Sequence, residues 1–99
     1  MKYYVIADED TVLGFSLVGL SGQAVHNGDE ARDAWSRALE DGQNAVIIIT
    51  ESVADMIRGT VDRYLFSESF PLVVEIPDPG KKSSRDLRRL VNEAVGVSI

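Results

Sequence analysis

Four short apolar runs recur along the 99-residue chain and predict its strands. They are Tyr3–Ala7, Gln23–His26, Ala45–Ile49 and Leu72–Ile76, and the second is the weakest. The other three are rich in β-branched residues and nearly unbroken, whereas a strand with one face in water alternates apolar and polar residues. Continuous apolar strands indicate a parallel sheet with helices on both faces.

The segment between the first two runs fits a helix. Asp10 or Thr11 is the expected N-cap, and Gly19 and Gly22 fall where the helix should end, because glycine is common just past a helix C-terminus. The predicted helix runs through the apolar residues Val12, Leu13, Phe15, Leu17 and Val18.

Two further segments show helical spacing. Asn27 to Asp29 can cap the first of them, which Gly42 closes, and its apolar positions are Ala31, Ala34, Trp35, Ala38 and Leu39. Thr50 or Ser52 begins the other, and Ser52 with Asp55 fits a capping box. Its apolar stripe is Val53, Ile57, Val61, Tyr64 and Leu65. A lone Trp35 on such a stripe is expected in the core rather than at an interface.

The order of elements is therefore βαβαβαβ. Right-handed crossovers predict an α/β fold, Rossmann-like or flavodoxin-like, with a four-stranded parallel sheet in the order 2-1-3-4 and helices on both faces. We expect the sheet domain to span residues 1–77.

Residues 78–84 read as a linker, because two prolines, a glycine and two serines fall between Pro77 and Ser84. Ser83 and Asp86 then fit a capping box for a hinged C-terminal helix over 85–99. Its apolar stripe is Leu87, Leu90, Val91, Ala94 and Val95. The sequence leaves two interpretations open: the stripe packs back on the sheet, or it contacts another helical protein.

Charge sets this last segment apart from the rest. Residues 81–99 carry five basic and two acidic side chains, a sum of +3, and the other 80 residues carry 5 basic and 14 acidic ones, a sum of −9. An acidic body disfavours nucleic acid as its partner. The chain has no cysteine, which excludes a disulfide framework, a thiolate metal site and a cysteine nucleophile. No apolar run approaches the length of a membrane span, so we expect a cytoplasmic protein without direct membrane insertion.

The acidic cluster Asp8, Glu9 and Asp10 follows the first strand, where doubly wound folds bind ligands. It could hold Mg²⁺, as in phosphate-accepting receiver domains. A receiver also needs an acceptor aspartate after the third strand, but Thr50 and Glu51 stand there. The simpler interpretation is that these acids cap the first helix and favour its positive end. A small-ligand module at the strand ends is a third possibility.

Other motifs for chemistry are incomplete. Gly14 and Gly19 have the spacing of a phosphate-binding loop, but Leu20 and Ser21 replace its Lys-Ser/Thr pair. His26 is the only histidine, so no histidine pair can bind a metal. We therefore predict no catalytic, cofactor or metal site.

Four segments together resemble the F subunit of the prokaryotic A/V-type rotary ATPases. They are Asp8–Leu20, Ile48–Ala54, Phe70–Pro77 and Val91–Gly96, in the same order along the chain. The resemblance implies a central-stalk rotor protein with no active site of its own. It also implies contacts with the coiled-coil D subunit of the stalk, with the catalytic A/B head through the C-terminal helix, and with the ring-connecting C subunit.

Within that resemblance, the helix contact is expected from one set of C-terminal residues: Arg85, Arg88, Arg89, Leu90 and Asn92. On the body the expected contact residues are Asp29, Arg32 and Arg37. The resemblance places the protein on the inner face of the membrane, peripheral to it, as part of the ATPase.

Overall fold

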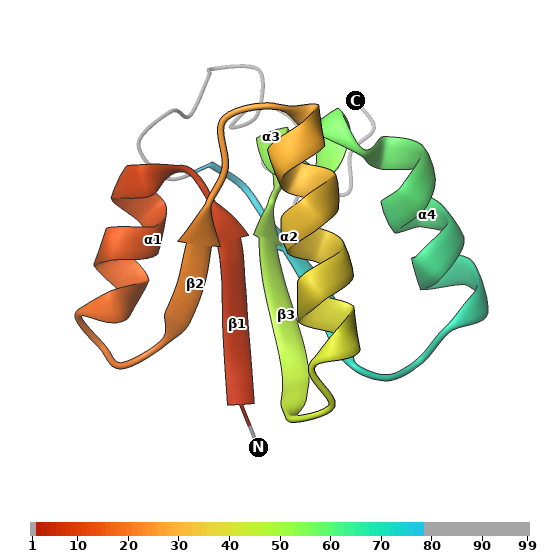
Figure 1. Ribbon diagram of the computed structural model, residues 1–99, viewed down its shortest axis with the longest axis horizontal. Coiled ribbons are helices and arrows are strands. Elements are labelled where there is room, and N and C mark those ends of the chain that lie inside the picture. Colours follow the sequence, from red (N-terminus) through yellow and green to blue (C-terminus); the bar gives the residue numbers. More distant parts are fainter. Residues whose placement is uncertain (1, 79–99) are drawn as a thin grey trace, which may run out of the picture.

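The computed structural model describes residues 2–78. Its sheet contains β1 (Lys2–Ala7), β2 (Ser21–Ala24), β3 (Asn44–Thr50) and β4 (Leu72–Ile76). All neighbouring strands are parallel and their order is β2-β1-β3-β4, which confirms the predicted fold class and strand order (Figure 1). The predicted linker beyond Asp78 and the helix over 85–99 lie outside the described residues.

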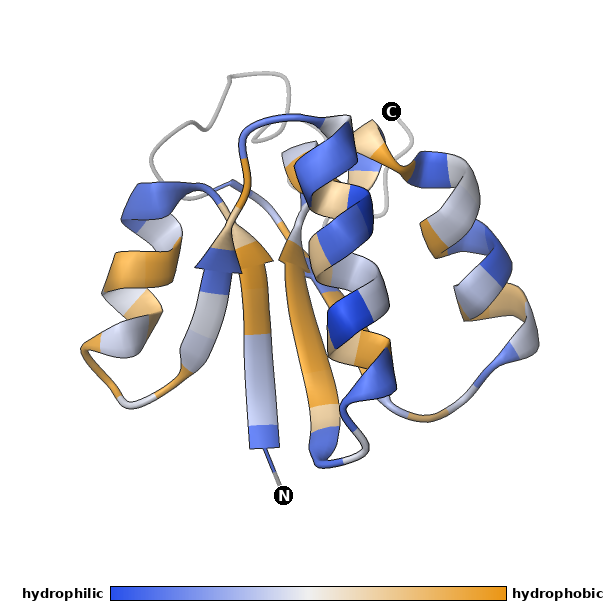
Figure 2. Cartoon of the chain, viewed as in Figure 1, coloured by the Kyte–Doolittle hydropathy of each residue, from blue (hydrophilic) through white to orange (hydrophobic). Residues whose placement is uncertain are grey.

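Four helices connect these strands: α1 (Glu9–Ser16), α2 (Gly28–Glu40), α3 (Glu51–Met56) and α4 (Arg58–Ser67). Right-handed crossovers place α1 on one face of the sheet and α2, α3 and α4 on the other. Figure 2 shows that β3 is apolar over most of its length, as expected for a central strand covered by helices.

The main core lies between the sheet and α2 to α4. Ile6, Ile47 and Ile49 are fully buried there. Trp35 of α2 is only 3% exposed and meets the ring of Tyr64 edge-on at a centroid distance of 5.5 Å. Trp35 is thus a core residue, as predicted. The stripe of α2 is confirmed as well, with Ala31, Ala34 and Ala38 buried and Leu39 packed at the margin.

Helix α1 differs from the prediction. Its N-cap is Asp8, not Asp10 or Thr11, and the helix ends at Ser16. Three of the five apolar residues assigned to this helix are exposed: Leu13 by 61%, Leu17 by 80% and Val18 by 74%. The physical reason is that β2 begins at Ser21, so the chain must already turn at Gly19, whose φ of +91° suits glycine.

Gly22 belongs to β2 rather than to a helix end, and the strand starts two residues before the predicted run. A Cβ at Gly22 would lie 2.5 Å from the carbonyl oxygen of Val5 and 2.8 Å from its Cβ. This position therefore requires glycine because the backbones of β1 and β2 approach closely here.

The expected third helix is two helices, because the chain bends at Ile57 (φ −131°, ψ 39°). Val53, Ile57 and Val61 of the predicted stripe are buried across this bend, whereas Leu65 is 47% exposed. Thr50 is the N-cap of α3 without a side-chain hydrogen bond. The predicted capping box of Ser52 and Asp55 does not form, because both side chains have partners elsewhere.

Candidate functional site

The acidic cluster after β1 serves the structure of α1. The carboxylate of Asp8 accepts hydrogen bonds from the backbone N–H of Thr11 at 3.2 Å and from its hydroxyl at 2.6 Å. Asp8 and the first-turn acids Glu9 and Asp10 also lie at the positive end of the helix dipole. Within residues 2–78, no group of three or more His, Asp or Glu side chains is arranged to hold a metal ion.

His26 joins α1 to α2 at the same edge of the sheet. Its Nδ1 lies 2.9 Å from Glu30 Oε1 and its Nε2 lies 3.0 Å from Glu9 Oε2. The backbone N–H of His26 also donates to Glu30 Oε1 at 2.8 Å. The hydrogen bonds to Glu30 and Glu9, with the negative charges of both, raise the pKa of His26 above its usual 6.5. The hydrogen bonds from His26 lower the pKa of Glu30.

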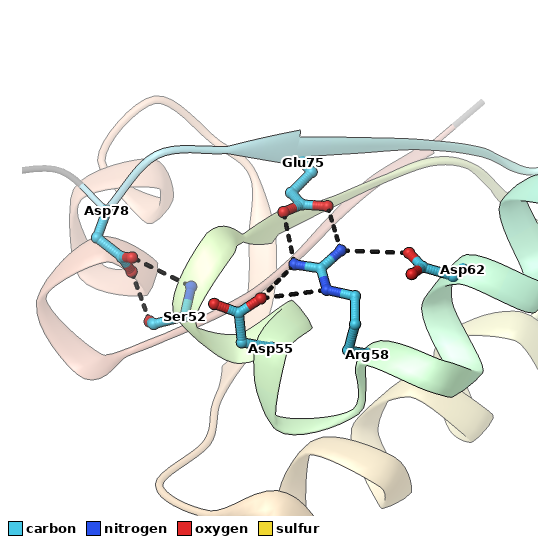
Figure 3. Close-up of polar contacts among 6 residues, drawn as sticks. All are labelled: Ser52, Asp55, Arg58, Asp62, Glu75 and Asp78. Carbon is cyan, nitrogen blue, oxygen red and sulfur yellow. Dashed lines mark hydrogen bonds and ion pairs between the residues drawn. The ribbon is translucent and has the colours of Figure 1, made fainter. Parts of the chain in front are cut away.

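A larger ionic cluster joins β4 to α3 and α4 (Figure 3). The guanidinium of Arg58 donates to both carboxylate oxygens of Glu75, at 2.9 and 2.8 Å. It also donates to Asp55 Oδ1 at 3.1 and 2.5 Å and to Asp62 Oδ1 at 3.4 Å. These carboxylates, Glu75 first, raise the pKa of Arg58. The guanidinium therefore stays charged and anchors the edge strand to the helices behind it.

Asp78 makes a second link at the end of β4. Its carboxylate accepts hydrogen bonds from the backbone N–H and the hydroxyl of Ser52, at 3.1 and 2.6 Å (Figure 3). A side chain 26 residues away thereby satisfies a free N–H in the first turn of α3. The point where the chain leaves the described domain is fixed by this contact.

Sequence reasoning misses both of these links. Two signals are present: Asp55, Arg58 and Asp62 have the i, i+3 and i+4 spacing of helical ion pairs, and Glu75 is the one charged residue of its strand. Neither signal identifies a partner across the fold, because pairing between distant segments depends on how the elements pack.

The predicted contact residues on the body, Asp29, Arg32 and Arg37, all belong to α2, along which Figure 2 shows mostly hydrophilic residues. Arg32 pairs with Asp29 at 2.7 Å, and Arg37 pairs with Asp33 one turn away. All four side chains are more than half exposed. Their partners are neighbours on the same helix, so the structure leaves their proposed role open. Arg85, Arg88, Arg89, Leu90 and Asn92 lie outside the described residues.

A hollow of about 420 Å³ lies beside α1, lined by Asp10, Thr11, Gly14, Phe15 and Val18. Its lining is mostly apolar, and among the described residues Asp10 is its one charged group.

Comparison with known proteins decides the family. The family of the ATP synthase (F/14-kDa) subunit matches residues 4–94. The chain belongs to this family. The F subunit of the A-type ATP synthase of Methanosphaera stadtmanae is 33% identical over 99 residues, which cover 96% of this chain and 92% of the relative. The corresponding protein of Methanocaldococcus jannaschii is 34% identical, over 100% and 99% of the two chains.

A bacterial relative extends the family beyond the A-type enzymes. The F subunit of the V-type ATP synthase of Clostridium botulinum is 34% identical over 99% of this chain and 96% of its own length. The predicted resemblance to the F subunit is confirmed, and this F-family chain is part of an A/V-type ATP synthase complex. No helix within residues 2–78 is long and apolar enough to cross a membrane.

Proposed function

We propose that this F-family protein is a non-catalytic rotor component of the central stalk in a V/A-type, proton- or sodium-translocating ATPase. It docks on the coiled-coil D subunit of the stalk and couples or regulates ATP hydrolysis or synthesis. One observation supports this proposal most. At the carboxyl edge of the sheet, where doubly wound folds bind ligands, Asp8, Glu9, His26 and Asp78 hold the fold together.

We extend the proposal to the surroundings of the protein in the complex. The C-terminal helix contacts the catalytic A/B head, the ring-connecting C subunit is a further candidate neighbour, and the protein is cytoplasmic and peripheral on the inner face of the membrane. The protein needs no cofactor in this role.

A docking protein that turns with the stalk must resist deformation. The Arg58 cluster and the Asp78–Ser52 contact tie the edge strand β4 to α3 and α4, so the body can act as one rigid unit. On the body we propose contacts from Asp29, Arg32 and Arg37, whose charged side chains are more than half exposed. On the C-terminal segment we propose contacts from Arg85, Arg88, Arg89, Leu90 and Asn92.

Binding to the purified D subunit tests this function. Calorimetry or co-purification of the full chain with the D subunit should give a one-to-one complex at about micromolar concentration. If no complex forms in that range with folded partners, the docking proposal is wrong.

Charge-reversal variants then test the contact residues. Replacing both Arg88 and Arg89 by Glu should weaken binding about tenfold or more. Like charges that face each other across an interface cost up to several kcal/mol of binding free energy, and about 1.4 kcal/mol already corresponds to a tenfold loss of affinity. The matched control is Arg63→Glu, an exposed arginine of α4 outside the proposed contacts. Equal weakening by the control would show a non-specific effect of net charge and would refute the assignment.

A further inference from the structure

The connection from β2 to α2, at the carboxyl edge of the sheet (Figure 1), ends in an Asn–Gly pair, Asn27 and Gly28. Asparagine is a labile residue, because the backbone nitrogen of the following residue can attack its side-chain amide carbon Cγ. Glycine in the following position hinders this attack least, since it has no Cβ. An Asn–Gly pair is therefore a candidate for deamidation, in which asparagine loses ammonia and becomes an acid.

Asn27 is also accessible to the water that this reaction consumes. Its side chain is exposed, and Gly28 is partly exposed. The other asparagine of residues 2–78 differs in every respect. Asn44 is only 2% exposed, its Nδ2 donates to the carbonyl oxygen of Ala38 at 2.9 Å, and it is followed by Ala45. Reactive sequence and exposure therefore coincide at Asn27 alone within the described part of the chain.

The folded structure holds Asn27 in a conformation that does not react. Asn27 is the N-cap of α2, and its Oδ1 accepts a hydrogen bond from the backbone N–H of Glu30 at 2.9 Å. Its backbone is extended, with φ −154° and ψ 177°. Ring closure requires rotation about the Cα–C bond of Asn27, which brings the nitrogen of Gly28 onto Cγ. This rotation moves the first turn of α2 relative to the capping side chain, so the cap and the ring exclude each other.

A second set of contacts holds the same turn closed. Glu30 Oε1 accepts the backbone N–H of His26 at 2.8 Å and lies 2.9 Å from the Nδ1 of that residue. Nε2 of His26 lies 3.0 Å from Glu9 Oε2 on α1. Because His26 and Glu30 flank Asn27 in the chain, Asn27 rotates freely only after these contacts open. Helix ends open locally far more often than whole domains unfold, so this opening controls the reaction.

We propose that Asn27 is a site of spontaneous deamidation and that the reaction occurs when the first turn of α2 opens. The nitrogen of Gly28 bonds to Cγ of Asn27 as the Cγ–Nδ2 bond breaks, and the proton of the Gly28 N–H ends on the ammonia that leaves. The cyclic imide then takes up one water. Addition of this water at Cγ gives aspartate, and addition at the backbone carbonyl carbon gives isoaspartate.

The two products affect α2 differently. Aspartate keeps an oxygen acceptor at the N-cap and adds a negative charge at the positive end of the helix, close to Asp29 and Arg32 in the chain. Isoaspartate carries the backbone through Cγ, which inserts an extra carbon atom before Gly28 and removes the cap. The modification thus either changes the surface charge of α2 or weakens its first turn. It is a property of the chain itself and does not depend on the proposed docking.

Peptide mass mapping of the full chain, incubated at a mildly alkaline pH, tests the proposal. In the folded chain, Asn27 should show the mass gain of an amide replaced by an acid, and Asn44 should not. In guanidinium chloride, where the helix is unfolded, Asn27 should react about tenfold faster or more. The readout is specific for asparagine, because isomerisation of the Asp41–Gly42 pair leaves the mass unchanged. No mass gain at Asn27 in the folded chain, or equal rates in the folded and denatured chains, would overturn the proposal.

A variant of Gly28 tests the chemistry without disturbing the fold. A Cβ at Gly28 would lie 3.6 Å from the carbonyl oxygen of Met56, which is an ordinary contact, and alanine favours the helix. Gly28→Ala should therefore fold, as circular dichroism would establish. It should deamidate at Asn27 about tenfold more slowly in the denatured chain, since its Cβ hinders the attacking nitrogen. An unchanged rate would show that the Gly28 nitrogen is not the attacking group.

A variant of Glu30 tests the control by the first turn. Glu30→Ala removes the side-chain contacts with His26 and leaves the Asn–Gly pair intact, so the folded variant should deamidate severalfold faster than the unmodified chain. The matched control is Glu40→Ala, an exposed glutamate at the other end of α2. The two variants should react at the same rate in guanidinium chloride. Equal rates in their folded states would contradict the proposal that opening of this turn controls the reaction.

Discussion

The ionic link between Arg58 and Glu75 makes a quantitative prediction about stability. The two side chains are 35% and 26% exposed, and the guanidinium meets both carboxylate oxygens. Well-shielded charge-assisted hydrogen bonds contribute about 1.5–3 kcal/mol, whereas exposed ion pairs contribute about 0.2–1 kcal/mol. Because water still reaches about a third of Arg58, we expect a coupling free energy of about 1 kcal/mol.

A double-mutant cycle of Arg58→Ala, Glu75→Ala and the double variant, followed by urea denaturation, measures this coupling. The matched control is the cycle of Arg37 and Asp33 on the surface of α2, where an exposed i,i+4 pair should give about 0.3–0.5 kcal/mol. About 1 kcal/mol corresponds to roughly 4–8 °C in melting temperature for a domain of this size.

Salt separates the charge contribution from packing. At about 1 M NaCl the Debye length falls to about 3 Å, so the control coupling should vanish while the less exposed Arg58–Glu75 coupling persists in part. A coupling of Arg58 and Glu75 no larger than that of the control would refute the reasoning that β4 is anchored by this pair.

Two further predictions concern Gly22 in β2 and His26 at the carboxyl edge of the sheet. Gly22→Ala should destabilise the fold by about 1–3 kcal/mol in urea denaturation, because the added Cβ would overlap the backbone of Val5. The control is Gly42→Ala, which has open space around the added Cβ and should change the free energy of unfolding by less than about 1 kcal/mol. The raised pKa of His26 means that protonated His26 stabilises the fold below about pH 6.5 and that this contribution is lost as the pH rises through its higher folded pKa. The melting temperature should therefore fall more between about pH 6 and pH 8 in the unmodified chain than in His26→Gln. Identical pH profiles of the two proteins would show that the contact of His26 with Glu9 and Glu30 contributes nothing to stability.

The sheet is predictable because its pattern is strong. Three nearly unbroken β-branched runs predict parallel strands, and crossover handedness leaves few possible orders. The weak strand β2 begins two residues earlier than its apolar run predicts, since Ser21 and Gly22 carry no strand signal of their own. Its position depends on pairing with β1, which sequence periodicity does not report.

Helix α1 shows where hydrophobicity misleads. Leu13, Leu17 and Val18 are large and apolar, yet they are exposed. Most buried positions hold apolar residues, but many apolar residues lie on the surface of a folded protein. The contacts of Arg58 with Glu75 and of Asp78 with Ser52 are unpredictable for a different reason: the partners lie 17 and 26 residues apart, and only the packed fold brings them together.

The parallel register of β4 has a mechanical consequence. Five residue pairs, from Val46 with Leu72 to Thr50 with Ile76, join β4 to β3 side by side. A pull on Asp78 along the axis of β4 would load the strand lengthwise from its carboxyl end, so the backbone hydrogen bonds along the ladder would be stretched together in shear. Peeling a strand breaks such bonds one after another, and it needs less force. The attachment of β4 thus suits the proposed rotor role, in which the protein would turn with the stalk.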